Sequence, residues 1–175
     1  GYIIDSLSTY GDMAIGIPGT IDGIFRAHER FGKNSIKNLF NYSIELAENG
    51  FPITKIQAKE FNDFKKDFKK FNPNNTYLQA EKWEEGDTLK QIDLANTLKI
   101  IQNKGRKGFY EGEVANSIIN TTKKNGLISL KDLRDYESIW RDPITLKFSN
   151  YKLISMPPPS SGGIALSQLL MMLVH

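Results

Sequence analysis

The stretch Met156-Pro157-Pro158-Pro159-Ser160-Ser161-Gly162-Gly163-Ile164 constrains the fold of this chain more than any other segment. Three consecutive prolines cannot donate backbone hydrogen bonds, and each fixes φ at about −65°, so we predict a stiff, extended strut. The apolar segment 164–174 that follows is typical of a helix. The Ser-Ser-Gly-Gly link at its start exposes free amide hydrogens, which suits either an N-cap or an anion site. We favour a rigid strand-to-helix connection with a serine N-cap.

The composition is that of a globular protein of about one domain. The 175 residues include 39% hydrophobic and 25% charged residues, and they carry a net charge of +3. So small and evenly spread a charge argues against a nucleic-acid partner. The sequence has no cysteine, which excludes disulfides, thiol nucleophiles and zinc–cysteine sites. No apolar run approaches the roughly 20 residues of a membrane span. Gly1-Tyr2-Ile3-Ile4 carries no signal-peptide features, and we expect the chain to be a piece of a larger protein.

Periodicity and capping signals predict a series of helices. A helix is expected over 21–31, and Ser35 is expected to cap the next, which Gly50 ends. The pairs Thr54/Gln57, Thr88/Gln91 and Ser129/Asp132 have the spacing of capping boxes, and each is expected to open a helix. These helices end at about residues 71, 101 and 136, and another spans about 113–124. The segment 108–112 is expected to be a glycine-flanked aromatic turn.

The helix expected before residue 71 combines four phenylalanines with the densest basic cluster of the chain. The phenylalanines recur at intervals of three, four and three residues, which predicts a stripe facing a core. They are Phe61, Phe64, Phe68 and Phe71. The lysines of the same segment are interpreted as a solvated face rather than a nucleic-acid site. They are Lys65, Lys66, Lys69 and Lys70.

The periodicity changes from 3.6 to 2 after residue 136, which predicts a β-hairpin. Apolar residues alternate with polar ones over 144–148 and again over 151–155. Ser149-Asn150 is a suitable two-residue turn, because asparagine tolerates positive φ. An isolated hairpin is marginally stable, so we expect it to belong to a larger sheet. The predicted organisation is one helical segment over 1–175, with helices at about 20–136, a hairpin at about 138–156 and a helix at about 163–174.

No complete catalytic constellation is visible in the sequence. The two histidines, His28 and His175, have no partners at metal-ligand spacing, so we expect no metal. The sequence has no Walker loop, EF-hand or dinucleotide fingerprint, so we expect no cofactor. Ser160 and Ser161 have a suggestive backbone setting but no evident local base. A serine hydrolase that uses one of them remains an alternative hypothesis. The acid pair Glu84-Glu85 is interpreted as solvated loop charge.

The order of short motifs is informative as a set. The series comprises Gly-Ile-Pro-Gly-Thr (16–20), Glu-Asn-Gly-Phe (48–51), Gly-Asp-Thr-Leu (86–89), Asp-Leu-Ala (93–95), Gly-Phe-Tyr-Glu-Gly (108–112), Leu-Lys-Asp-Leu (130–133), Arg-Asp-Pro-Ile (141–144) and the stretch 156–163. In this order and at these intervals it resembles the large subunit of γ-glutamyltranspeptidases, over about residues 16–175. The chain departs from that pattern at Ile92, at Gly126-Leu127 and at Asn150, which concern turns and caps.

The resemblance implies a mainly α chain with a β-hairpin, as a fragment of an N-terminal nucleophile hydrolase of the α/β/β/α type. It also implies that a self-cleaving precursor exposes an N-terminal threonine, which attacks γ-glutamyl amides such as glutathione. The acyl group then passes to water, amino acids or peptides, and the α-amine of the threonine acts as the base. That threonine would lie beyond residue 175, so no catalytic residue is expected in this chain, which alone should be inactive. Ser160, Ser161, Gly162 and Gly163 are expected to line or support the cleft.

The expected partners are the rest of the large subunit and the small subunit of the same precursor, with glutathione-like donors and no nucleic acid. The resemblance implies a periplasmic, extracellular or cell-surface location, with a signal peptide outside this chain. Cephalosporin acylases and capsule-processing γ-glutamyl hydrolases share the architecture, so a related acylase or hydrolase is an alternative. A self-standing, non-catalytic helical interaction module is another.

Overall fold

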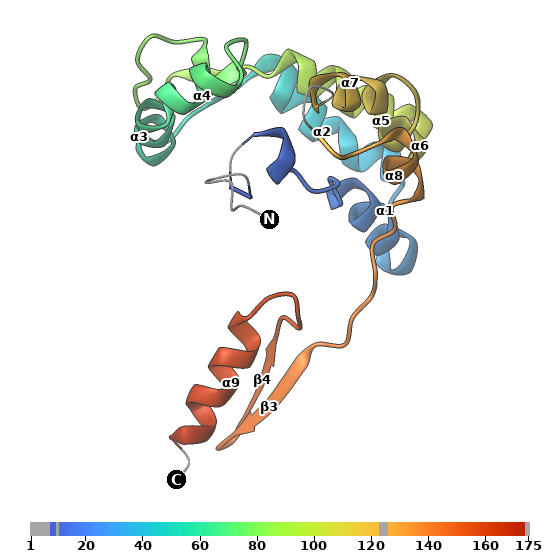
Figure 1. Ribbon diagram of the computed structural model, residues 1–175, viewed down its shortest axis with the longest axis vertical. Helices are drawn as coiled ribbons and strands as arrows, with labels where there is room; N and C mark the ends of the chain where they lie inside the picture. The colour runs from blue at the N-terminus through green and yellow to red at the C-terminus, as the bar shows by residue number, and fades with distance from the viewer. Residues whose placement is uncertain (1–7, 10, 123–125, 174–175) are drawn as a thin grey trace, which may run out of the picture. The chain divides into compact units, whose positions relative to one another are not determined.

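The computed structural model describes residues 8–9, 11–122 and 126–173, which form two compact units (Figure 1). The described residues up to Glu137 make up a helical unit, and those from Ser138 onward make up a hairpin unit. The expected helix residues 123–124 and 174 lie outside the described residues.

The helical unit contains α1 to α8 and one short pair of strands. Its helices are α1 (Thr20–Phe31), α2 (Ile36–Asn49), α3 (Lys55–Asp63), α4 (Lys65–Phe71), α5 (Ile92–Lys104), α6 (Lys107–Tyr110), α7 (Gly112–Thr122) and α8 (Leu130–Asp135). Two 3-10 turns, η1 (Asp12–Ala14) and η2 (Thr76–Leu78), complete it. Strand β1 (Phe51–Pro52) pairs antiparallel with β2 (Thr88–Leu89), a small sheet that the sequence did not reveal.

Two of the three predicted capping boxes are confirmed. The hydroxyl of Thr54 accepts the Gln57 N–H, and that of Ser129 accepts the Asp132 N–H, with the reciprocal bonds also present. The box predicted at Thr88 is wrong, because the backbone of Thr88 pairs with Pro52 in the β1–β2 sheet. Helix α5 therefore begins at Ile92. The turn predicted at 108–112 is also wrong, since its first residues belong to α6.

The prediction that four phenylalanines form one stripe facing the core is only half correct. Phe61 and Phe68 pack on the ring of Tyr77, with ring centroids 4.7 and 5.3 Å away. Phe64 and Phe71 are instead 55% and 47% exposed. The single helix expected here is two helices, because Phe64 is the C-cap of α3 and the N-cap of α4. The break interrupts the periodicity that would have carried all four rings to one face.

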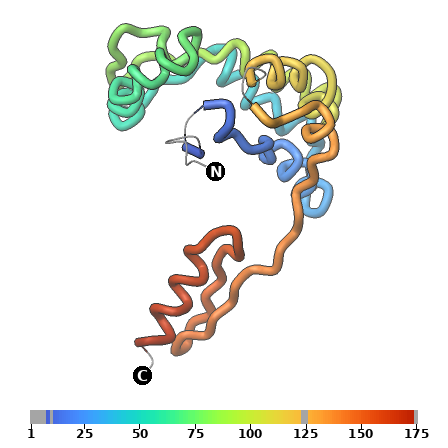
Figure 2. Tube along the Cα trace, viewed as in Figure 1, coloured from blue at the N-terminus to red at the C-terminus, as the bar shows by residue number. Residues whose placement is uncertain are grey.

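Three buried clusters form the interior of the helical unit. The first gathers around Trp83 and Leu89, next to α3. The second joins α2 to α5 through Phe40, Ile44 and Ile101; Figure 2 shows the traces of these two helices side by side. The third contains Tyr110, Ala115 and Leu133, from α6, α7 and α8. This last cluster lies beside the candidate site described below.

The hairpin unit consists of β3 (Ile144–Phe148), β4 (Tyr151–Ser155) and α9 (Gly162–Met172). The predicted hairpin is confirmed, with Ile144 opposite Ser155 and Phe148 opposite Tyr151. Positive φ in its turn falls on Ser149, at 52°, and not on Asn150 as expected. Helix α9 packs along the hairpin (Figure 1).

The proline stretch is not the extended strut that the sequence suggested. The Ser160 N–H donates to the carbonyl oxygen of Pro157 at 3.2 Å, so the chain turns at Pro158-Pro159, whose peptide bond is cis. A serine occupies the N-cap position of α9 as predicted, but the expected side-chain capping bond is absent. Ser161 precedes α9 in a helical conformation and makes no side-chain capping bond.

Candidate functional site

Asp22, on α1, is a buried carboxylate with only 2% of its surface exposed. Arg106, just before α6, donates from Nε to Asp22 Oδ1. The Nε of Arg26, one turn further along α1, lies 3.3 Å from Asp22 Oδ2. A buried charge is costly unless it is paired and hydrogen-bonded. The two guanidinium groups satisfy that requirement here.

Arg106 connects this carboxylate to the end of α8. Its Nη2 donates to the carbonyl oxygen of Tyr136. Its guanidinium carbon lies 4.4 Å from the centroid of the Tyr110 ring, and that ring stacks on Tyr136 at a centroid distance of 5.9 Å. A planar guanidinium can donate in two directions while it stacks on an aromatic face. One side chain thus holds α1 and the residue after α8 together.

The hydroxyl of Tyr110 completes the arrangement. It donates to the carbonyl oxygen of Pro18 at 2.6 Å and accepts the backbone N–H of Asp22 at 3.2 Å. Burial raises the pKa of Tyr110 above its ordinary value, because the phenolate would be poorly solvated. Tyr110 is therefore neutral at physiological pH. We call Asp22, Arg26, Arg106, Tyr110, Tyr136 and Glu137 the Asp22 network.

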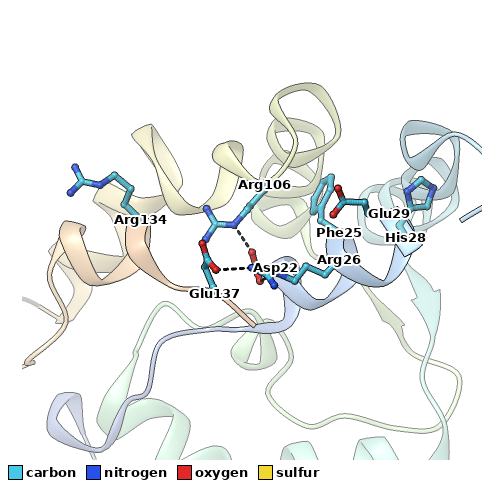
Figure 3. A pocket seen from close by; sticks show the side chains of 8 residues that line it. All are labelled: Asp22, Phe25, Arg26, His28, Glu29, Arg106, Arg134 and Glu137. Atoms are coloured by element: carbon cyan, nitrogen blue, oxygen red, sulfur yellow. Dashed lines mark hydrogen bonds and ion pairs between the residues drawn. The ribbon is translucent and has the colours of Figure 1, made fainter. Parts of the chain in front are cut away.

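A cleft of about 830 Å³ lies beside this network (Figure 3). Its lining consists of Asp22, Phe25, Arg26, His28, Glu29, Arg106, Arg134 and Glu137. Several of these groups pair within the protein: Arg26 Nη2 lies 2.8 Å from Glu137 Oε2, and Arg134 Nε lies 3.1 Å from Asp135 Oδ1. His28 Nε2 lies 2.7 Å from the carbonyl oxygen of Asn34. The arrangement is suited to holding helices together rather than to attacking a substrate.

The predicted cleft residues lie in the hairpin unit. Ser160 lines a groove of about 830 Å³ together with Trp140, Arg141 and the three prolines. Its Oγ accepts the Gly162 N–H at 3.4 Å, and Ser161 is exposed. Gly163 is buried, and a Cβ there would overlap the carbonyl oxygen of Met156. In the part of the chain that the structure describes, no three acidic, His or Cys side chains gather as a metal site.

The sequence alone does not indicate the Asp22 network. One signal was available, because Asp22 and Arg26 have the i, i+4 spacing of a helical ion pair. Nothing in the sequence joins Asp22 to Arg106, which lies 84 residues later.

Comparisons with known proteins agree on one family. A family model described as Gamma-glutamyltranspeptidase matches residues 4–175. The glutathione hydrolase proenzyme of Bacillus subtilis (strain 168) is 39% identical over 164 residues, which cover 93% of this chain and 28% of that protein. The capsule biosynthesis protein CapD proenzyme of Bacillus anthracis is 36% identical, over 89% of this chain and 29% of its own length. The chain therefore spans less than a third of each of these relatives.

The fold leads to the same family. The crystal structure of Helicobacter pylori gamma-glutamyltranspeptidase matches with a TM-score of 0.89 and 38% identity, over 96% of this chain and 49% of that one. This match confirms the predicted fold class, a mainly helical part of an N-terminal nucleophile hydrolase with a β-hairpin. Of the helices described, none has the length and apolar character needed to cross a membrane. This chain belongs to the gamma-glutamyltranspeptidase family.

Proposed function

We propose that this chain is part of the large subunit of an enzyme that cleaves γ-glutamyl amides such as glutathione. The acyl group is transferred to water, amino acids or peptides. The observation that carries the proposal is the family match over residues 4–175, together with 39% identity to a glutathione hydrolase proenzyme. The match extends over both units of the chain, so it does not depend on a single motif.

In this proposal the nucleophile is an N-terminal threonine outside this chain. Its own α-amine takes the hydroxyl proton, so no histidine base is required. The site geometry supports a structural role for the residues described here. Among them, Asp22 is the one buried carboxylate, and its two arginine partners keep it from acting as a free base.

We further propose that the segment Ser160–Gly163 supports the substrate cleft from the large-subunit side. The position of Ser160 in the lining of the hairpin-unit groove supports this role. Gly163 contributes through packing, because the absence of a Cβ lets α9 approach the end of β4 closely.

The proposed partners are the remainder of the large subunit and the small subunit, both cut from the same precursor. The names of the relatives support a precursor, since the Bacillus subtilis and Bacillus anthracis proteins are both called proenzymes. The proposed location is periplasmic, extracellular or at the cell surface.

The test uses a precursor that contains this chain. Incubated with γ-glutamyl-p-nitroanilide, the processed precursor should release p-nitroaniline. Replacing the threonine that becomes the N-terminus of the small subunit by alanine should abolish the release. The 175-residue chain alone should release none. A processed but inactive precursor, or release by the isolated chain, would contradict the proposal.

A capsule-processing γ-glutamyl hydrolase is the second candidate. The identity to the CapD proenzyme, 36%, is close to that with the glutathione hydrolase. Comparing kcat/KM of the processed precursor for glutathione and for short poly-γ-glutamate chains separates the two. A higher value for poly-γ-glutamate would favour the second candidate.

A further inference from the structure

The helical unit ends at a segment without helix or strand. Helix α8 stops at Asp135, and no regular structure follows before β3 begins at Ile144. At this end a backbone bond runs from the Tyr136 N–H to the Leu133 carbonyl, and it is 3.4 Å long. Backbone hydrogen bonding alone therefore holds residues 136 and 137 weakly.

The Asp22 network holds these two residues instead. Arg106 donates both to Asp22 and to the carbonyl oxygen of Tyr136. Arg26 pairs with Asp22 at 3.3 Å and with Glu137 at 2.8 Å. Both residues are thus tied, through one arginine each, to the same buried carboxylate on α1.

Packing fixes the Tyr136 side chain as well. Its ring stacks on Tyr110, and its hydroxyl lies so close to Gly19 that a Cβ there would overlap it. Side-chain contacts with residues far away in the sequence therefore determine where the chain leaves the helical unit.

We infer that Asp22 and Arg106 are positioning residues, which fix the exit of the chain from the helical unit through Tyr136 and Glu137. The chain continues from this exit into the hairpin unit. The consequence for catalysis rests on the proposed function. The structural part concerns this chain alone.

The first test is hydrogen exchange, measured by mass spectrometry, on the 175-residue chain and its Arg106→Lys variant. Lysine keeps the positive charge beside Asp22, but its single ammonium cannot reproduce the planar fork that reaches both Asp22 and the Tyr136 carbonyl. We expect exchange of the Tyr136 amide, which donates to the Leu133 carbonyl, and of the last-turn amides of α8 to accelerate at least about tenfold, while amides in α2 and α5 change by less than about twofold.

The matched control is Lys99→Gln, which removes an exposed ion pair, 2.7 Å long, between α5 and Glu48 of α2. It should leave exchange of the Tyr136 amide and of the last turn of α8 unchanged. Unchanged exchange of the Tyr136 amide and of the last turn of α8 in Arg106→Lys would overturn the inference. So would equal acceleration in α2 and α5, because the network would then contribute only to global stability.

The second test places both variants in the precursor. Arg106→Lys should lower kcat for γ-glutamyl-p-nitroanilide about tenfold and leave KM within about twofold, because misplacement affects reaction geometry more than binding. Lys99→Gln should retain wild-type values. Unchanged kcat beside accelerated exchange would refute the positioning role and leave the proposed function intact. An inactive wild-type precursor would instead refute the proposed function.

Discussion

The hydroxyl of Tyr110 donates a hydrogen bond to the carbonyl oxygen of Pro18, at 2.6 Å and across 92 residues of sequence. Only 1% of Tyr110 is exposed, and its hydroxyl also accepts the Asp22 N–H. One phenol group therefore satisfies two backbone groups at the start of α1. It joins α6 to the segment that leads into α1.

Tyr110→Phe should destabilise the helical unit by about 1–3 kcal/mol, the usual cost of leaving buried polar groups without a partner. The ring and its packing on Tyr136 are retained, so the change isolates the hydroxyl. The measurement is urea unfolding followed by far-UV circular dichroism. Tyr42→Phe, at a side chain that is 69% exposed, is the control and should change stability little. Equal effects of the two variants would contradict the assignment.

The ionisation of Tyr110 gives a pH prediction. Burial raises the pKa of its hydroxyl in the folded state, so the neutral form is favoured by folding. The stabilisation is fully present below the unfolded-state pKa of about 10 and is lost as pH rises through the higher folded-state pKa. Absorbance at 295 nm should show one of the seven tyrosines ionising late, as the fold is lost. Tyr110→Phe should remove that late step.

Gly19 and Gly23 form a matched pair at the start of α1. A Cβ at Gly19 would overlap the Tyr136 hydroxyl, whereas a Cβ at Gly23 would meet no atom within 4 Å. Gly19→Ala should cost about 1–3 kcal/mol through overpacking. Gly23→Ala should instead stabilise the chain by about 0.5–1 kcal/mol, because it removes a glycine from a helix. Thermal unfolding tests both, and shifts of Tm in the same direction would contradict the geometry.

Gly163 and Gly162 form a second matched pair at the start of α9. A Cβ at Gly163 would overlap the Met156 carbonyl oxygen, whereas at Gly162 the nearest atom is Ser160 Oγ at 3.6 Å. Gly163→Ala should weaken the packing of α9 on the hairpin by about 1–3 kcal/mol. Hydrogen exchange of the β3 and β4 amides should accelerate in that variant and stay near wild type in Gly162→Ala. The opposite order would show that α9 does not depend on this close approach.

Local signals in the sequence predicted local structure well. The capping boxes at Thr54 and Ser129 formed, because their partners lie three residues away. The β3–β4 hairpin formed because a two-residue turn brings its alternating strands together. The box at Thr88 failed because a strand 36 residues earlier competes for its backbone, with Thr88 opposite Pro52. Tertiary pairing overrode a local preference there.

The candidate site depended on distant contacts and was harder to predict. The Ser-Ser-Gly-Gly composition of residues 160–163 indicated a candidate cleft segment, and its role in the cleft stays a proposal. Asp22 and Arg106 carried no such signal, since their pairing arises only when α1 and α6 come together. The family resemblance, in contrast, was accessible because it rests on the order of many short motifs, and the family match confirms it.

The buried charge of Asp22 also restricts how this family member can evolve. Losing Arg106 alone leaves the buried Asp22 carboxylate with one of its two arginine partners, and losing Asp22 alone leaves the Arg106 guanidinium on the Tyr110 ring without its carboxylate. Natural drift should therefore replace the two positions in concert, commonly by uncharged residues, rather than one at a time. Among homologues, an aspartate at the first position should accompany an arginine at the second.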